Sequence, residues 1–106
     1  MHKGRIVLVP FPFTDLSGLK VRPALVLHVS KGEDCVVAFI SSARGRKSPF
    51  EISIKATNQN GLKVDSVLKV DKIATLQKKI VLGELGIAEK HIIASVDASL
   101  RKLFKL

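Results

Sequence analysis

The chain has 106 residues, of which 46% are hydrophobic and 25% charged, a composition that predicts one folded domain over residues 1–106 and excludes a disordered chain. Eighteen Lys and Arg residues against nine Asp and Glu residues give a formal net charge of +9, which is typical of proteins that bind a polyanion, with nucleic acid as the first expectation. The single cysteine, Cys35, excludes a disulfide within the chain, and no apolar stretch reaches the ~18 residues of a membrane span. We therefore expect a cytoplasmic protein that has no membrane partner.

The first half of the chain predicts short strands separated by turns. Residues 5–9, apolar after Arg5, predict a strand that we expect to end at Pro10, because proline has no N–H to donate to a sheet. Residues 23–30 and 35–41 are two further apolar runs, and a polar turn at residues 31–34 separates them. Residues 50–54 alternate apolar and polar side chains, so we expect a strand with one buried face.

The second half predicts two more strands and one helix. Residues 66–76 form a strand region that we expect to be interrupted near Asp71 and Lys72, and residues 79–85 form another. The apolar residues between 92 and 104 follow a helical period, and we expect all of them, Phe104 included, to face the core. Many short strands followed by one helix predict a mainly-β (α+β) fold, a small, strongly curved β-barrel with the helix covering one end.

Arg22 is the first candidate functional residue. Because Pro23 follows it, Arg22 is biased toward an extended conformation, and we expect it at the stiff entrance of a strand. A planar guanidinium suits a phosphate, or the charge that develops on a phosphate during cleavage. The alternative is that Arg22 is a solvated charge at a strand end.

The order of several segments resembles the MazF/PemK toxins of type II toxin–antitoxin systems over nearly the whole chain. The more specific parts of this resemblance are the Arg22-Pro23 dipeptide and the run 37–41, which ends in the hydroxyl of Ser41. The resemblance implies an SH3-like barrel, a homodimer and a metal-independent endoribonuclease that cleaves single-stranded RNA at short motifs without a cofactor. It also implies a cognate antitoxin whose acidic tail blocks the site.

The resemblance assigns the catalytic pair to Arg22 and Ser41, and two questions accompany this assignment. Ser42 follows Ser41, and a shift of one residue along a strand would place the other hydroxyl on the catalytic face. The chain also departs from the family at Arg5, where many members have an acidic residue, and at Val21, where some have a histidine. The second departure removes a candidate proton carrier.

The remaining candidates are expected to bind RNA rather than to cleave it. They are basic, aromatic or hydroxyl residues close to the catalytic pair or at matching family positions: Lys20, Phe13, Ser42, Arg44, Arg46, Lys47 and Thr75. Two rival functions stay open. One is a non-enzymatic toxin of the same fold that resembles the CcdB gyrase inhibitors, and the other is a plain RNA-binding module.

Overall fold

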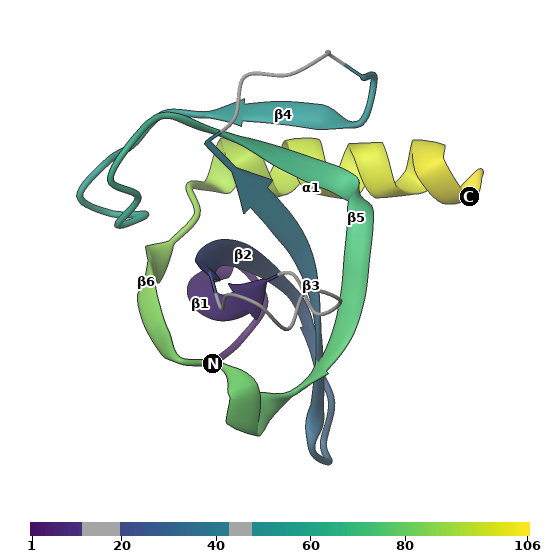
Figure 1. Cartoon of the computed structure of the whole chain (residues 1–106). Coiled ribbons are helices and arrows are strands. Elements are labelled where there is room, and N and C mark those ends of the chain that lie inside the picture. The colour runs from purple at the N-terminus through teal and green to yellow at the C-terminus, as the bar shows by residue number, and fades with distance from the viewer. Residues whose placement is uncertain (12–19, 43–47) are drawn as a thin grey trace.

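The computed structural model describes residues 1–11, 20–42 and 48–106. It contains a six-stranded antiparallel sheet in the order β4-β5-β3-β2-β1-β6, followed by one helix. In chain order the elements are β1 (Arg5–Phe11), β2 (Lys20–Val29), β3 (Asp34–Ser41), β4 (Glu51–Ile54), β5 (Ser66–Gln77), a 3-10 turn η1 (Lys78–Ile80), β6 (Gly83–Ile87) and α1 (Lys90–Phe104). The sheet curls into a half-barrel with β5 and β6 on opposite sides (Figure 1). The expected strongly curved β fold with a terminal helix is therefore confirmed.

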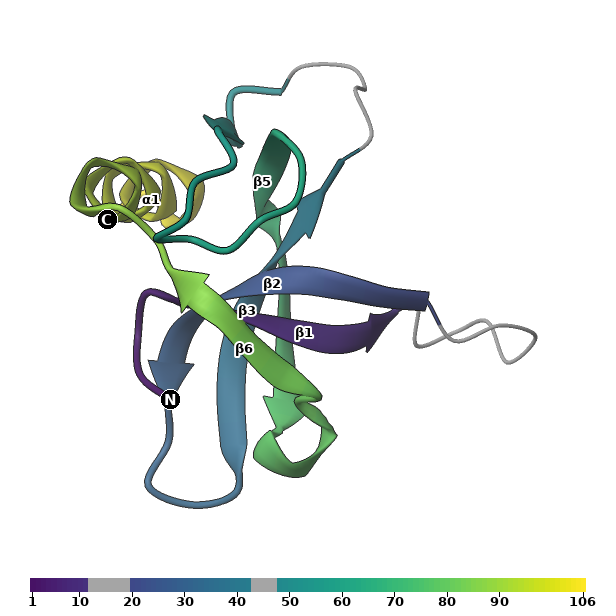
Figure 2. The ribbon, with the colours of Figure 1, turned by 90° about the vertical axis from the view of Figure 1, so that its left-hand side faces the viewer.

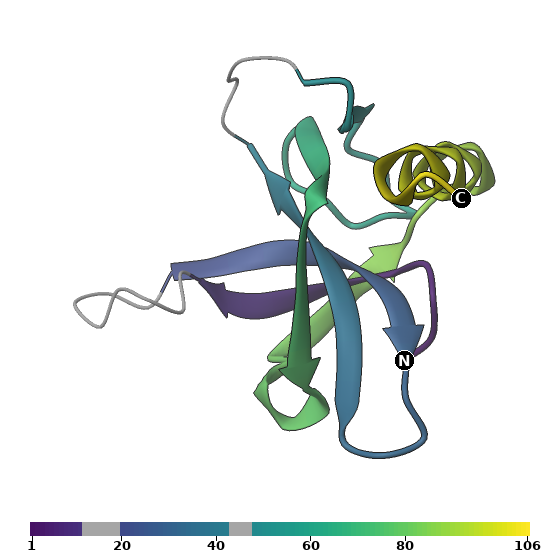
Figure 3. The same ribbon diagram turned by 90° about the vertical axis from the view of Figure 1, so that its right-hand side faces the viewer.

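The sheet buries side chains on both of its faces, which explains why its central strands are almost continuously apolar. One core cluster includes Ile6, Leu25 and Ile40, and it also receives Ile92 and Val96 from α1. The other includes Val7, Val26 and Val37 on the opposite face. Helix α1 packs against β4 and β5. Figures 2 and 3 view the helix nearly along its axis and show it at one side of the curled sheet.

Four details differ from the sequence predictions. Strand β1 continues through Pro10, which pairs with Val21 of β2. Leu82 N donates to Leu8 O, so the backbone N–H and C=O of Leu8 face β6 and not β2. The backbone of Pro10, two residues further on, faces the same side. The pairing of β1 with β6 has already ended at Leu8, so no strand lies opposite Pro10 there. The missing N–H of Pro10 therefore costs no ladder bond.

Strand β2 correspondingly starts at Lys20 rather than at Pro23, so Arg22 lies inside the strand and not at its entrance. Residues 79–85 are not one strand, because η1 interrupts them before β6 begins at Gly83. Phe104 is 58% exposed and does not face the core, so the apolar stripe of α1 ends before it.

Strand β5 runs unbroken from Ser66 to Gln77, but its pairing with β3 is interrupted where the sequence predicted a break. Ala38 of β3 pairs with Ile73, but its neighbour Phe39 pairs with Lys69, so residues 70–72 have no partner on β3 in these two fully described strands. Val70 turns into the core, and its backbone N–H donates to Phe50 O. This bulge bends β5 and projects Asp71 and Lys72 beside the end of β3.

Candidate active site

Pro23 creates the opening in which the predicted catalytic pair lies. In the described strands β2 and β3, pairing begins at Ala24 with Phe39, because Pro23 has no N–H for the next ladder bond. If the same register continued, Arg22 would lie opposite Ser41, two residues beyond the pair Ala24 and Phe39. Side chains two residues apart on a strand share a face, so Arg22 and Ser41 lie on the same face of the sheet. The two strands therefore stop pairing just before Arg22 and Ser41, and both residues lie at this opening.

A cleft of about 360 Å³ opens at this point, and we call it the Arg22 cleft. Its described lining residues are Arg22, Phe39, Ile40, Ser41, Lys69, Asp71, Lys72 and Ile73. Its volume is in the range of small-molecule and cofactor sites, ~300–1,000 Å³. Three cationic side chains accompany one carboxylate among these residues, so the cleft favours an anionic ligand.

Three charged residues of the cleft were not among the sequence candidates. Lys69, Asp71 and Lys72 come from β5, where the bulge at residues 70–72 brings them beside β3. The predicted break near Asp71 was the only signal for them in the sequence, and it did not indicate that β5 pairs with the strand of Ser41. Phe39 is half-buried, packs against the second core cluster and lines the cleft as well.

A second hollow of about 360 Å³ lies beside the first, and we call it the Lys63 hollow. Arg22 and Ile40 line both of them, whereas Ser42 and Lys63 line only the second. Ser41 and Ser42 therefore point in different directions, as alternation along a strand requires. The structure brings Ser41, not Ser42, together with the charged residues of β5.

The other sequence candidates lie elsewhere or outside the described part of the chain. Lys20 is exposed at the start of β2, two residues before Arg22, and lines neither hollow among their described residues. Thr75 pairs with Val36, five residues along β3 from Ser41, which is roughly 16 Å at the usual strand rise. The structure therefore does not bring Thr75 to the cleft. Phe13, Arg44, Arg46 and Lys47 lie outside the described residues.

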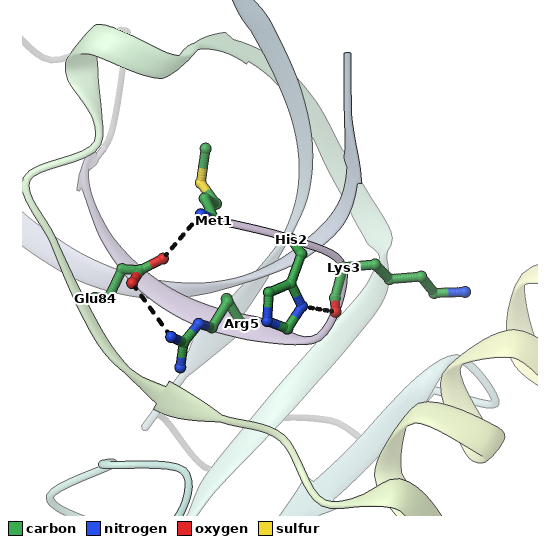
Figure 4. Close-up of polar contacts among 5 residues, drawn as sticks. All are labelled: Met1, His2, Lys3, Arg5 and Glu84. Atoms are coloured by element: carbon green, nitrogen blue, oxygen red, sulfur yellow. Dashed lines mark hydrogen bonds and ion pairs between the residues drawn. The ribbon is translucent and has the colours of Figure 1, made fainter. Parts of the chain in front are cut away.

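Arg5 takes part in an ion-pair cluster at the start of the chain (Figure 4). Its guanidinium lies 3.7 Å from one oxygen of Glu84 on β6, and the amino group of Met1 lies 3.7 Å from the other. His2 Nδ1 also lies 2.9 Å from Lys3 O in this segment. Neither hollow includes Arg5 in its described lining, and the ion pair with Glu84 instead joins β1 to β6.

Cys35 lies in neither hollow's described lining. Cys35 is fully buried, and burial raises the pKa of its thiol, with a smaller rise from Asp34 and an opposing effect of Lys78. Ranges 1–11, 20–42 and 48–106 contain no group of three His, Cys, Asp or Glu residues that could hold a metal ion. In the same ranges, no helix has the length and apolar content needed to cross a bilayer.

The curled sheet with its single helix and cationic cleft defines a small β half-barrel domain suited to an anionic ligand. Residues 2–104 match the PemK-like, MazF-like toxins of type II toxin-antitoxin systems, and the chain belongs to this family. No curated protein sequence matches the chain.

Several solved structures share the fold. MazF from Deinococcus radiodurans has a TM-score of 0.80 and 23% identity, covering 100% of this chain and 97% of that chain. A MazE-MazF structure from Deinococcus radiodurans has a TM-score of 0.77 and 25% identity, with coverages of 100% and 97%. An endoribonuclease in complex with its cognate antitoxin, from a mycobacterial species, has a TM-score of 0.78 and 17% identity, with coverages of 100% and 96%.

Proposed function

We propose that this chain is a toxin endoribonuclease that cleaves single-stranded RNA at short sequence motifs. The observation that carries the proposal is the composition of the Arg22 cleft in a chain of this toxin family. The cleft joins a guanidinium, a hydroxyl, a carboxylate and two ammonium groups drawn from three strands. A structure of similar fold is an endoribonuclease in complex with its cognate antitoxin, which supports the same activity here.

RNA supplies its own nucleophile, the 2′-OH, so the protein must move protons and stabilise charge. In our proposal, the Asp71 carboxylate accepts the 2′-OH proton while the 2′ oxygen bonds to phosphorus. Arg22 stabilises the charge on the phosphorane, and Ser41 donates a hydrogen bond to the same phosphate. The P–O5′ bond then breaks and the 5′ oxygen takes a proton from Lys69 or Lys72, leaving a 2′,3′-cyclic phosphate. These lysines take the place of the histidine that some members of the family carry at the position of Val21.

The proposed reaction needs no metal ion. The described lining of the Arg22 cleft contains only one carboxylate, Asp71, whereas divalent-metal sites for phosphate chemistry gather several oxygen ligands. The cationic side chains Arg22, Lys69 and Lys72 supply the positive charge that a metal would otherwise bring to the phosphorane.

We further propose that a cognate antitoxin inhibits the enzyme by placing an acidic tail in the Arg22 cleft, and that the active form is a homodimer. The net charge of +9 supports the first point, because an acidic peptide is the electrostatic equivalent of RNA. Exposed apolar side chains outside both described linings, such as Leu82 and Phe104, 59% and 58% exposed, support the second.

The test is an assay of the purified chain on a long single-stranded RNA in the presence of EDTA. We expect cleavage at short motifs and products that end in a 2′,3′-cyclic phosphate. The Arg22→Ala variant should cleave more slowly than the wild-type chain by a factor on the order of 10²–10³. Products carrying a 5′-phosphate would contradict 2′-OH attack. Tight RNA binding with no cleavage by the wild-type chain would instead indicate the binding module.

A further inference from the structure

The Lys63 hollow is cationic and lies next to the Arg22 cleft. Its described lining contains Arg22 and Lys63 but no Asp or Glu, and aliphatic side chains such as Val21, Val64 and Leu85 form its walls. Because Arg22 lines both hollows, a chain whose phosphate is held by Arg22 can extend into the Lys63 hollow. An anionic chain with apolar faces between its charges fits this arrangement.

Lys63 lies on the β4–β5 loop, which is held by an unusually complete set of hydrogen bonds around Asn60. Asn60 is fully buried, and its Oδ1 accepts from Thr57 N and Leu62 N, each at 3.0 Å. Its Nδ2 donates to Lys55 O at 2.8 Å and to Glu89 Oε1 at 3.2 Å. The Asn60 amide therefore uses both of its donors and its acceptor, and it fixes the loop immediately before Lys63.

The backbone of the same loop is in direct contact with the backbone of β6. Ile87 N donates to Gln59 O at 2.9 Å. A Cβ atom added at Gly61 would collide with Leu85 O, and one added at Gly86 would collide with Gln59 O. Gly61 also has a φ of 72°, which favours glycine. Thr57 completes the lock, since its Oγ1 donates to Glu89 Oε2 at 2.6 Å.

From these contacts we infer that Lys63 binds a phosphate of the RNA chain next to the cleaved one, and that Asn60 is the positioning residue that holds Lys63 there. The inference rests on the proposed ribonuclease function and adds a second substrate contact to it. The nucleotide between the two phosphates occupies the Lys63 hollow, with its base against the aliphatic walls. This contact positions substrate and takes no part in the bond-breaking step.

The first test compares Lys63→Ser with Lys31→Ser, an exposed lysine of the β2–β3 turn outside both described linings. The substrate is a short single-stranded RNA that the wild-type chain cleaves, and a copy with a 2′-deoxy group at the cut site serves for binding. We expect Lys63→Ser to raise KM several-fold at unchanged kcat, and to flatten the log–log salt slope of binding by about 0.7, as for one lost phosphate contact. Lys31→Ser should leave KM and kcat unchanged.

The second test is a double-mutant cycle between Asn60→Asp and Lys63→Ser. An aspartate at position 60 loses both Nδ2 donors and faces the Glu89 carboxylate, so the loop should shift and KM should rise. If Asn60 acts through Lys63, Asn60→Asp should raise KM little further in the Lys63→Ser background. The exposed Thr57→Val offers a milder disturbance of the same lock if Asn60→Asp does not fold.

Separate outcomes overturn separate claims. A wild-type chain that cleaves RNA but a Lys63→Ser variant with unchanged KM and salt slope would overturn this inference alone. Additive effects on KM in the cycle would show that Asn60 does not act through Lys63. A wild-type chain that cleaves no RNA would overturn the proposed function itself.

Discussion

Ser41 and Ser42 are adjacent in the chain but line different hollows: Ser41 lies with Asp71 in the Arg22 cleft, and Ser42 lies with Lys63 in the neighbouring hollow. The alternation of side chains along β3 produces this separation. Under the proposed function, the two hydroxyls contact different parts of a bound RNA, Ser41 at the reacting phosphate and Ser42 beside the flanking nucleotide.

Replacing each serine in turn tests this assignment. We expect Ser41→Ala to lower kcat on the order of 10², the scale for losing one preorganised donor at developing charge. Ser42→Ala should leave kcat unchanged, and any effect should fall on KM. Ser53→Ala on β4 is the control for removing an exposed strand hydroxyl. Single-turnover cleavage rates provide the measurement. A larger loss of rate in Ser42→Ala than in Ser41→Ala would show that Ser42 is the catalytic hydroxyl.

Asp71 is expected to be essential for proton transfer. Asp71→Asn preserves the size of the side chain but removes the proton acceptor, so kcat should fall on the order of 10²–10⁴. The matched control is Asp34→Asn, because Asp34 is an exposed carboxylate at the other end of β3 from Ser41. RNA binding by Asp71→Asn should be at least as tight as that of the wild-type chain, since a negative charge has left the cleft. Near-normal cleavage would assign the base to another group.

The carboxylate of Glu89 should make stability depend on acid pH. Burial raises its pKa, but hydrogen bonds from Thr57, from the backbone and from Asn60, together with the charge of His91, outweigh burial and lower the pKa from the ordinary 4.5. A carboxylate with a lowered folded-state pKa stabilises the fold above pH 4.5, and this stabilisation disappears as the pH falls through the folded-state pKa.

Urea denaturation between pH 7 and pH 3 provides the measurement for Glu89. We expect Glu89→Gln to be less stable than the wild-type chain at pH 7, and the difference to shrink as the pH falls below 4.5. A constant difference across the whole range would show that the ionised form of Glu89 is not what stabilises the loop.

Gly86 should tolerate no side chain, because its position faces backbone rather than a movable side chain. An added Cβ would meet Gln59 O and the backbone of Asn60. We expect Gly86→Ala to lower the free energy of unfolding by about 1–3 kcal/mol, as overpacking does. Gly32→Ala is the control, because no atom lies within 4 Å of its added Cβ. Equal melting temperatures for the two variants would contradict the close approach.

The sequence by itself determined the strand-forming segments, the bulge region of β5 and the family resemblance. These are local properties, because apolar runs, prolines and the helical period depend on neighbours in the chain. Pro23 marked Arg22 as a candidate, and the resemblance to the family, which rests on the same local segments, paired it with Ser41. The sequence also predicted the break at Asp71 but gave it no partner.

The tertiary structure alone decided which distant residues meet. Lys69 and Asp71 reach the Arg22 cleft because β5 pairs with β3 and its register shifts at a bulge. The register between two strands so far apart in the chain cannot be predicted from the sequence of either strand alone. The same register carries Thr75 to the far end of β3. Asn60 resembles an ordinary loop residue in the sequence, and only the approach of β6 and Glu89 buries its amide and makes it the anchor of Lys63.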